Sequence, residues 1–181
     1  MTNPLVKGTY ANIFIPARVH IPAADGGHLV VVPSRRVLDT TELRFNEANE
    51  LHLMKLIAKR ILTEAFDEEI ARGGIGTFNY QENGNWSVHL PENQQHAHIH
   101  VYGRGREAET QPFGKALDFS NFEKDLDFKG YPYWGGHIDM MLEAKNKVLM
   151  LSDIPAEYQT LNRRRPGSSG SSPGYLSFDP S

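Results

Sequence analysis

The stretch QQHAHIHVYGR, residues 94–104, carries the least common pattern in the chain. Three histidines alternate there with two small or apolar residues: His96, Ala97, His98, Ile99 and His100. Successive side chains of a β-strand point to opposite faces, so a strand over 96–102 places all three imidazoles on one face. The stretch therefore predicts a strand with an apolar face toward the core and a row of histidines on the other face.

A metal site is one use of such a row. Neighbours on one face of a strand lie about 6.6–6.8 Å apart, so the first and third histidines are about 13 Å apart. Zinc lies about 2.0–2.1 Å from a ligating nitrogen, so two adjacent histidines could share an ion, whereas all three would reach it only with difficulty. A metal site would therefore combine two of them with His28, Glu82 or Glu92.

Attack on phosphorus is the other use. A histidine is a competent nucleophile near neutral pH without a thiol or an activated hydroxyl. Neighbouring imidazoles can hold the oxygens on which charge develops. A neutral nucleophile is also not repelled by a polyphosphate.

The flanking sequence indicates a sheet and one long helix. Apolar runs predict strands at 12–15, 28–32, 75–80 and 85–90, in addition to the histidine stretch, with the ENGN turn at 82–85. Apolar residues recur every three or four positions between Asn46 and Phe66, which predicts a helix with Asn46 as N-cap and Gly73-Gly74 as its stop. The order β-β-α-β-β-β favours the α+β class: an antiparallel sheet of about five strands, with the helix packed on one face.

Length and composition bound the remaining possibilities. We expect a core over 1–106, an irregular extension packed on it over 107–162, which includes a helix near 137–151, and a flexible Gly/Ser/Pro-rich tail over 163–181. The chain has no cysteine, a net charge of -3 and a pI of about 6.2, which give no overall attraction to nucleic acid or to an anionic membrane. Without a recognisable signal peptide or apolar span, a cytoplasmic protein is expected.

Two blocks of the sequence resemble the histidine-triad (HIT) family. HAHIHVY, residues 96–102, matches the family pattern of three histidines alternating with apolar residues. GGHLVVVPSRRV, residues 26–37, is similar to the strand block that precedes the family's long helix. The resemblance covers about residues 10–106 and implies a HIT-like sheet, a homodimer and a nucleotide substrate.

The resemblance also implies roles for the histidines. His98 would be the nucleophile that forms a covalent nucleotidyl-histidine at the α-phosphate, and water would then hydrolyse it. His100 would contact the phosphate or the leaving-group oxygen, His96 would support the row by hydrogen bonding, and His28 would be a fourth imidazole beside it. The transferase branch of the family has glutamine at the third position, so His100 favours hydrolysis.

The residues expected to contact the substrate match the family pattern less closely than the histidines do. A family amide that binds phosphate oxygens corresponds to Asn85, with Asn83 and Gln81 as alternatives in the same loop. His20 stands where the family often has a ribose-binding acid. Asn93 and Gln94 precede the triad without the hydroxyl that usually assists the leaving group.

The sequence thus predicts a HIT-type hydrolase of a dinucleoside polyphosphate, a nucleoside phosphoramidate or a related nucleotidyl compound. No cofactor is expected, and no zinc, because relatives with a structural zinc bind it through cysteines. The alternatives are a metal-dependent enzyme that uses two triad histidines and a nucleotide-binding protein without catalysis.

Overall fold

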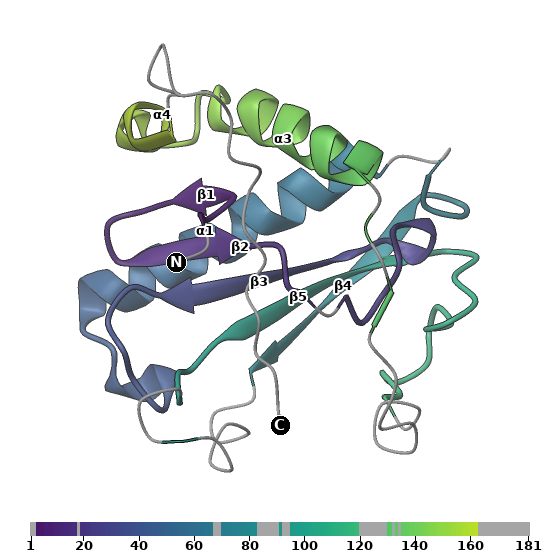
Figure 1. Ribbon diagram of the computed structural model, residues 1–181, viewed down its shortest axis with the longest axis horizontal. Coiled ribbons are helices and arrows are strands. Elements are labelled where there is room, and N and C mark those ends of the chain that lie inside the picture. The colour runs from purple at the N-terminus through teal and green to yellow at the C-terminus, as the bar shows by residue number, and fades with distance from the viewer. Residues whose placement is uncertain are drawn as a thin grey trace.

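The computed structural model shows one antiparallel sheet of five strands in the order β1-β2-β3-β5-β4 (Figure 1). It describes residues 3–17, 19–66, 70–82, 91, 95–119, 130–131, 133 and 135–162. The strands are β1 (Val6–Lys7), β2 (Ala11–Phe14), β3 (His28–Pro33), β4 (Ile75–Glu82) and β5 (Ile99–Gly105). Short 3-10 turns η1 (Ala23–Asp25) and η2 (Thr40–Glu42) flank β3. The predicted α+β fold with a sheet of about five strands is confirmed.

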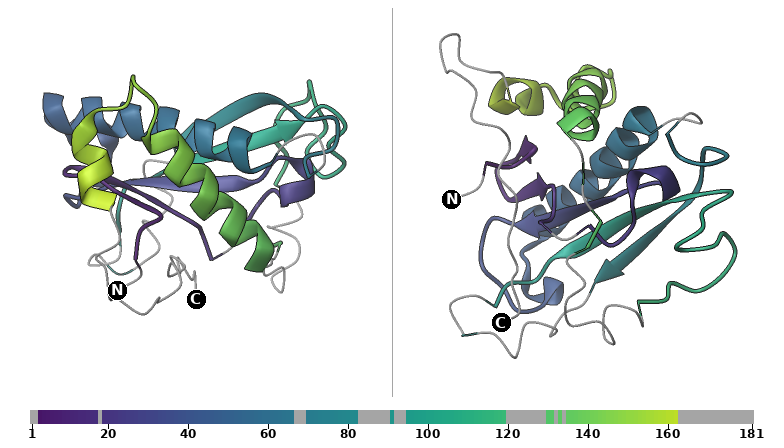
Figure 2. Two further views of the ribbon diagram at one scale, coloured as in Figure 1. Left: turned by 90° about the horizontal axis from the view of Figure 1, so that it is seen from above. Right: turned by 45° about the vertical axis from the view of Figure 1, so that its right-hand side comes forward.

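The long helix α1 (Phe45–Ala65) covers one face of the sheet, as Figure 2 shows. Its apolar side and the inward residues of β3 and β5 form one buried cluster. Leu29 and Val31 of β3 meet Ile99 and Val101 of β5 in this cluster. The helix therefore fixes which face of β5 is apolar, and its other face is left for the histidines.

Two further helices lie beyond β5 in the sequence. Helix α3 (Gly135–Leu149) packs against α1, and α4 (Ala156–Asn162) contacts β1. Both lie on the β1 side of the sheet in Figure 1. The helix expected near 137–151 is thus present, whereas α4 and the two-residue strand β1 were not predicted. No helix within the described ranges is long and apolar enough to cross a bilayer.

The ends of α1 differ from the prediction. The N-cap is Arg44 rather than Asn46, because the carboxylate of Glu47 accepts the backbone N–H of Arg44 at 2.8 Å and closes the first turn two residues earlier. Gly73 and Gly74 do adopt the left-handed conformation, with φ of 67° and 68°, but they lie in a turn eight residues after the helix has ended.

Some predictions fall on residues outside the described ranges. These are the ENGN turn beyond Glu82, the strand at 85–90 and the tail at 163–181. The division into a core, an extension and a tail remains a prediction. Side chains of the extension do belong to the same buried cluster as the sheet and α1, for example Tyr133, Met141 and Val148.

Candidate functional site

The face of the sheet opposite α1 carries the imidazoles. Strand β5 begins at Ile99, so His96 and His98 lie in the extended segment just before it, and His100 lies within it. Ile99 is the first residue of β5 and pairs with both Val31 of β3 and Glu82 of β4. In register, His28 lies opposite Tyr102, and Gln81 lies opposite His100. Three strands, β3, β4 and β5, thus bring these side chains together.

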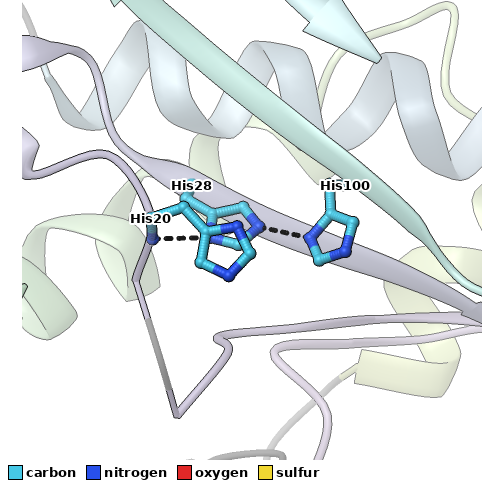
Figure 3. A group of neighbouring side chains, drawn as sticks. All are labelled: His20, His28 and His100. Carbon is cyan, nitrogen blue, oxygen red and sulfur yellow. Dashed lines mark hydrogen bonds between the residues drawn. The ribbon is translucent and has the colours of Figure 1, made fainter. Parts of the chain in front are cut away.

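A chain of hydrogen bonds begins at a backbone amide. The N–H of His20 donates to Nδ1 of His28 at 3.2 Å, and a backbone N–H can only donate. Nδ1 of His28 therefore accepts, and the proton of the neutral ring is on Nε2. This nitrogen lies 2.8 Å from Nδ1 of His100 and donates to it (Figure 3). The tautomer of His28 thereby sets the tautomer of His100.

The chain ends at a backbone carbonyl. Nε2 of His100 lies 3.1 Å from Nε2 of His98, and Nδ1 of His98 lies 3.1 Å from the carbonyl oxygen of His96. A carbonyl can only accept, so His98 carries its proton on Nδ1 and has a lone pair on Nε2. Assigned from either end, the protons fall on the same nitrogens. Each of the three rings holds one proton.

Burial keeps these rings neutral. The pKa of His28 is lowered well below 6.5, first by burial and then by the neighbouring His20, His100 and His98. Burial also lowers the pKa of His100 well below 6.5, with His98 and His20 as the next causes. For His98, burial lowers the pKa more than the hydrogen bond to the His96 carbonyl raises it. At pH 7 the His98 ring is therefore neutral, and its lone pair lies on Nε2, which accepts from Nε2 of His100.

His20 lies over this cluster from the loop before β3. Its Nδ1 is 2.8 Å from the hydroxyl of Tyr102, and its ring centroid is 5.1 Å from that of His100. Tyr102 also donates to Oε1 of Gln81 at 3.3 Å. The ring of Phe119, from the extension, lies 5.4 Å from the rings of both His20 and Tyr102. An imidazole, a phenol and a phenyl ring thus border the histidines at one end.

Two buried ionic groups hold the extension at this end. The carboxylate of Asp25 is fully buried and accepts from Arg72 Nη1 at 2.7 Å and from the Thr110 amide at 2.6 Å. It is therefore a structural group that ties the turn before β3 to the extension. Arg104, on the histidine face of β5, donates to the carbonyls of Gln111, Pro112 and Lys115. These contacts fix the start of the segment that carries Phe119.

A third anchor lies directly behind His28. The hydroxyl of Tyr133 accepts the backbone N–H of His28 at 2.5 Å and donates to its carbonyl at 3.1 Å. Tyr131 pairs through its backbone with Val19, next to His20. The backbone on both sides of the cluster is therefore held by residues of the extension.

The predicted site residues divide into three groups. His28, His98 and His100 are joined by hydrogen bonds, with His20 and Gln81 beside them. His96 is turned away, because its Nε2 donates to the Arg35 carbonyl at 3.3 Å, although its own carbonyl ends the chain. The amides outside the described residues are Asn83, Asn85, Asn93 and Gln94.

A metal ion is the other occupant that this cluster suggests. One nitrogen each of His20, His28 and His100 lie within 4.8 Å of one another. Binding through Nε2 of His28 would move the proton of that ring to Nδ1, where it would face the N–H of His20 at 3.2 Å. The proton-linked arrangement thus disfavours a metal there. Glu82 does not serve as a ligand either, because it lies opposite the core residue Ile99 and contacts Thr40.

Solved structures share this fold, although no protein-family model and no curated protein matches the sequence. A zinc-bound histidine-triad family protein from Mycobacterium smegmatis has a TM-score of 0.50 and 16% identity, over 82% of this chain and 86% of its own. A hypothetical histidine-triad nucleotide-binding protein from Sulfolobus tokodaii has a TM-score of 0.53 and 11% identity, over 82% of this chain and 87% of its own. The NitFhit protein of C. elegans has a TM-score of 0.47 and 16% identity, over 81% of this chain and 27% of its own.

The chain therefore has the histidine-triad fold. The resemblance seen in the two sequence blocks is confirmed at this level. Tyr102 and Phe119 are the site neighbours that the sequence reasoning missed. The even spacing of 96, 98, 100 and 102 could have identified Tyr102, whereas no local pattern identifies Phe119.

Proposed function

We propose that this protein is a nucleotide hydrolase in which His98 attacks the α-phosphate of a nucleotidyl substrate. The observation that carries the proposal is the lone pair on Nε2 of His98, whose Nδ1 proton is held by the His96 carbonyl. The substrate class is a dinucleoside polyphosphate, a nucleoside phosphoramidate or a related compound. The similarity of the fold to histidine-triad proteins and the spacing of the three histidines support this proposal.

The reaction has two displacements. Nε2 of His98 forms a bond to the α-phosphorus, while the bond from phosphorus to the leaving group breaks and its electron pair goes to that group. Water then attacks the nucleotidyl-histidine, the P–N bond breaks, and the nucleoside monophosphate is released with loss of a proton to solvent. In both steps the N–H on Nε2 of His100, 3.1 Å from Nε2 of His98, is placed to donate to a phosphoryl oxygen.

The other proposed substrate contacts are residues that lie beside the triad or match family positions. Gln81 and His20 lie beside His100 and are proposed to contact phosphate and sugar. Asn83, Asn85, Asn93 and Gln94 are proposed phosphate ligands by resemblance to the family alone. Tyr102 and Phe119 add aromatic surface beside His20, where a nucleoside could stack.

Intact-mass spectrometry after a brief, quenched reaction with a panel of nucleotides tests the proposal. We expect an added nucleotidyl mass on the parent and on His52→Ala, which removes an exposed histidine of α1, but none on His98→Ala. Because the added mass identifies the nucleotide, the same experiment reports the base. Full turnover by His98→Ala of every substrate that the parent cleaves would refute the nucleophile assignment.

A metal-dependent reaction is the competing function, because three imidazole nitrogens lie close together. Elemental analysis of the protein before and after treatment with a chelator, with activity measured on both samples, separates the two functions. We expect activity to survive complete removal of metal. Loss of activity with the metal, and its return on addition of zinc, would favour the competing function.

The assembly and the location are proposals of the same kind. We infer a homodimer by resemblance to the family, and a cytoplasmic location because the sequence contains no cysteine. Light scattering at micromolar concentration checks the assembly. A mass of only about 20 kDa, that of one 20.4 kDa chain, would contradict the dimer.

A further inference from the structure

We propose that Arg36 binds the distal phosphates of the leaving group, those beyond the β-phosphate, and so gives the site a preference for long polyphosphate chains. The inference rests on the proposed function and names the residue that would select the leaving group. It follows from the way in which the segment after β3 is joined to the segment that leads into the triad.

The residues on both sides of Arg36 anchor it beside the start of the triad. The carbonyl of Arg35 accepts Nε2 of His96 at 3.3 Å. The carbonyl of Val37, a core residue, accepts the backbone N–H of Ala97 at 2.7 Å. The backbone of Arg36 is therefore held between two hydrogen bonds to the segment that carries the first histidine.

The side chain of Arg36 lies along the same segment. Its Nε donates to the carbonyl of Gln95 at 2.8 Å. This bond uses one of the five N–H groups of a guanidinium, and the other four are on its two terminal nitrogens. Arg36 is exposed, and among the described residues it forms no ion pair. Its terminal nitrogens are thus placed to bind phosphate oxygens in the bidentate geometry that arginine favours.

The neighbouring Arg35 has a different role. Its Nη2 lies 2.8 Å from Oε2 of Glu47, so its charge is compensated at the start of α1. The charge of Arg36 instead acts at the triad. Burial is the largest cause that lowers the pKa of His96, and the positive charge of Arg36 is a further cause. Arg36 is therefore the arginine of this pair that can attract an anion to the histidines.

The two ends of the triad differ in chemistry. The rings of His20, Tyr102 and Phe119 border one end. Arg36 supplies a cation at the other end, where the segment before the triad begins. Because the proposed function places the nucleoside at the aromatic end, the remaining phosphates of the substrate would extend toward Arg36.

The separation between Arg36 and the nucleophile determines which phosphates it can reach. Gln95, which holds the guanidinium, lies three residues before His98, and this is about 10 Å along an extended backbone. A leaving group without further phosphates stays close to His98, whereas a chain of several phosphates covers this interval. The effect of Arg36 should therefore depend on the length of the chain, and salt should screen it because the residue is exposed.

The test compares a long and a short leaving group on the nucleoside that the mass adduct identifies. The long substrate is the dinucleoside tetraphosphate of that nucleoside, and the short one is the nitrophenyl ester of its monophosphate. Arg36→Gln removes the charge. Arg106→Gln is the matched control, because Arg106 is an exposed arginine just after β5 that also donates to a backbone carbonyl, that of Gly73 at 2.9 Å. We measure kcat/KM for both substrates at low and high salt.

We expect a selective loss in Arg36→Gln. Its kcat/KM should fall by about 5- to 20-fold with the tetraphosphate, which loses a charged hydrogen bond, and by less than about twofold with the nitrophenyl ester. Added salt should lower kcat/KM of the parent for the tetraphosphate more than that of Arg36→Gln. Arg106→Gln should behave as the parent does with both substrates.

The outcomes separate the inference from the function on which it rests. An equal loss with both substrates in Arg36→Gln, or the same selective loss in Arg106→Gln, would overturn the inference. A parent that forms an adduct with the nitrophenyl ester but does not cleave the tetraphosphate, or cleaves it without any dependence on salt, would overturn it as well. No adduct with the ester, or full turnover by His98→Ala, would instead count against the proposed function.

Discussion

The hydroxyl of Tyr133 offers a sharp test of whether the extension is part of the site. Tyr133→Phe keeps the ring, which is 7% exposed, and removes only the oxygen that bridges the backbone N–H and C=O of His28. A buried polar group left without its partner costs about 1–3 kcal/mol. Because the oxygen serves two backbone groups of a fully buried residue, we expect the free energy of unfolding to fall by about 2–3 kcal/mol.

Urea denaturation followed by far-UV circular dichroism measures this change. With a slope of about 2 kcal/mol per molar urea, the midpoint should fall by about 1 M. The control is Tyr80→Phe, in a β4 ring that is 45% exposed, where we expect a change below about 0.5 kcal/mol. The rate of adduct formation should fall for Tyr133→Phe as His28 loses its support. Equal stability of both variants, with unchanged adduct formation, would refute the reasoning.

Three further predictions concern the cap of α1, the close contact of β5 with the turn before β3, and the aromatic border of the site. Hydrogen bonds from Arg35 and the Arg44 amide lower the pKa of Glu47 from 4.5 to about 2. Its carboxylate therefore stabilises the fold above pH 4.5 and loses this effect as the pH falls toward 2. Glu47→Gln should flatten this part of the pH dependence of stability, measured by thermal unfolding. In Gly103→Ala the new methyl would clash with the carbonyl oxygen of Gly26. We therefore expect the free energy of unfolding to fall by about 1–3 kcal/mol, measured from the midpoint of unfolding. An unchanged midpoint would contradict this packing. Phe119→Ala should raise KM severalfold with less change in kcat, and steady-state kinetics that show the reverse would exclude a binding role for the ring.

Sequence reasoning could predict the features that depend on neighbouring residues. The alternation around His98 determines which side chains face α1, and Ile99 and Val101 do lie in the core. It could not predict that Nε2 of His98 and Nε2 of His100 lie 3.1 Å apart, because that distance depends on how both rings rotate toward each other. The estimate of about 6.6–6.8 Å along the strand describes the backbone, not the ring nitrogens.

Features that depend on distant residues could not be predicted. Asp25 contacts Thr110, and Tyr133 contacts His28, across 85 and 105 residues of sequence. Neither pair has a spacing pattern of its own. The displaced start of α1 has a similar cause, because Glu47 binds both the Arg44 amide and the Arg35 side chain and so outweighs the capping preference of Asn46.

The bridge from Tyr133 to His28 also has a consequence for the order of folding during synthesis. The ribosome releases the sheet, α1 and all three triad histidines before it releases the tyrosine that holds the His28 backbone. Domains form from the N-terminus during translation, and contacts between distant residues form last. A nascent chain that ends near residue 106 would thus carry the whole triad, while His28, the first residue of the neighbouring strand β3, is not yet held by Tyr133. The extension therefore times when the histidine cluster is complete: the His28 backbone is held only after residue 133 has left the ribosome.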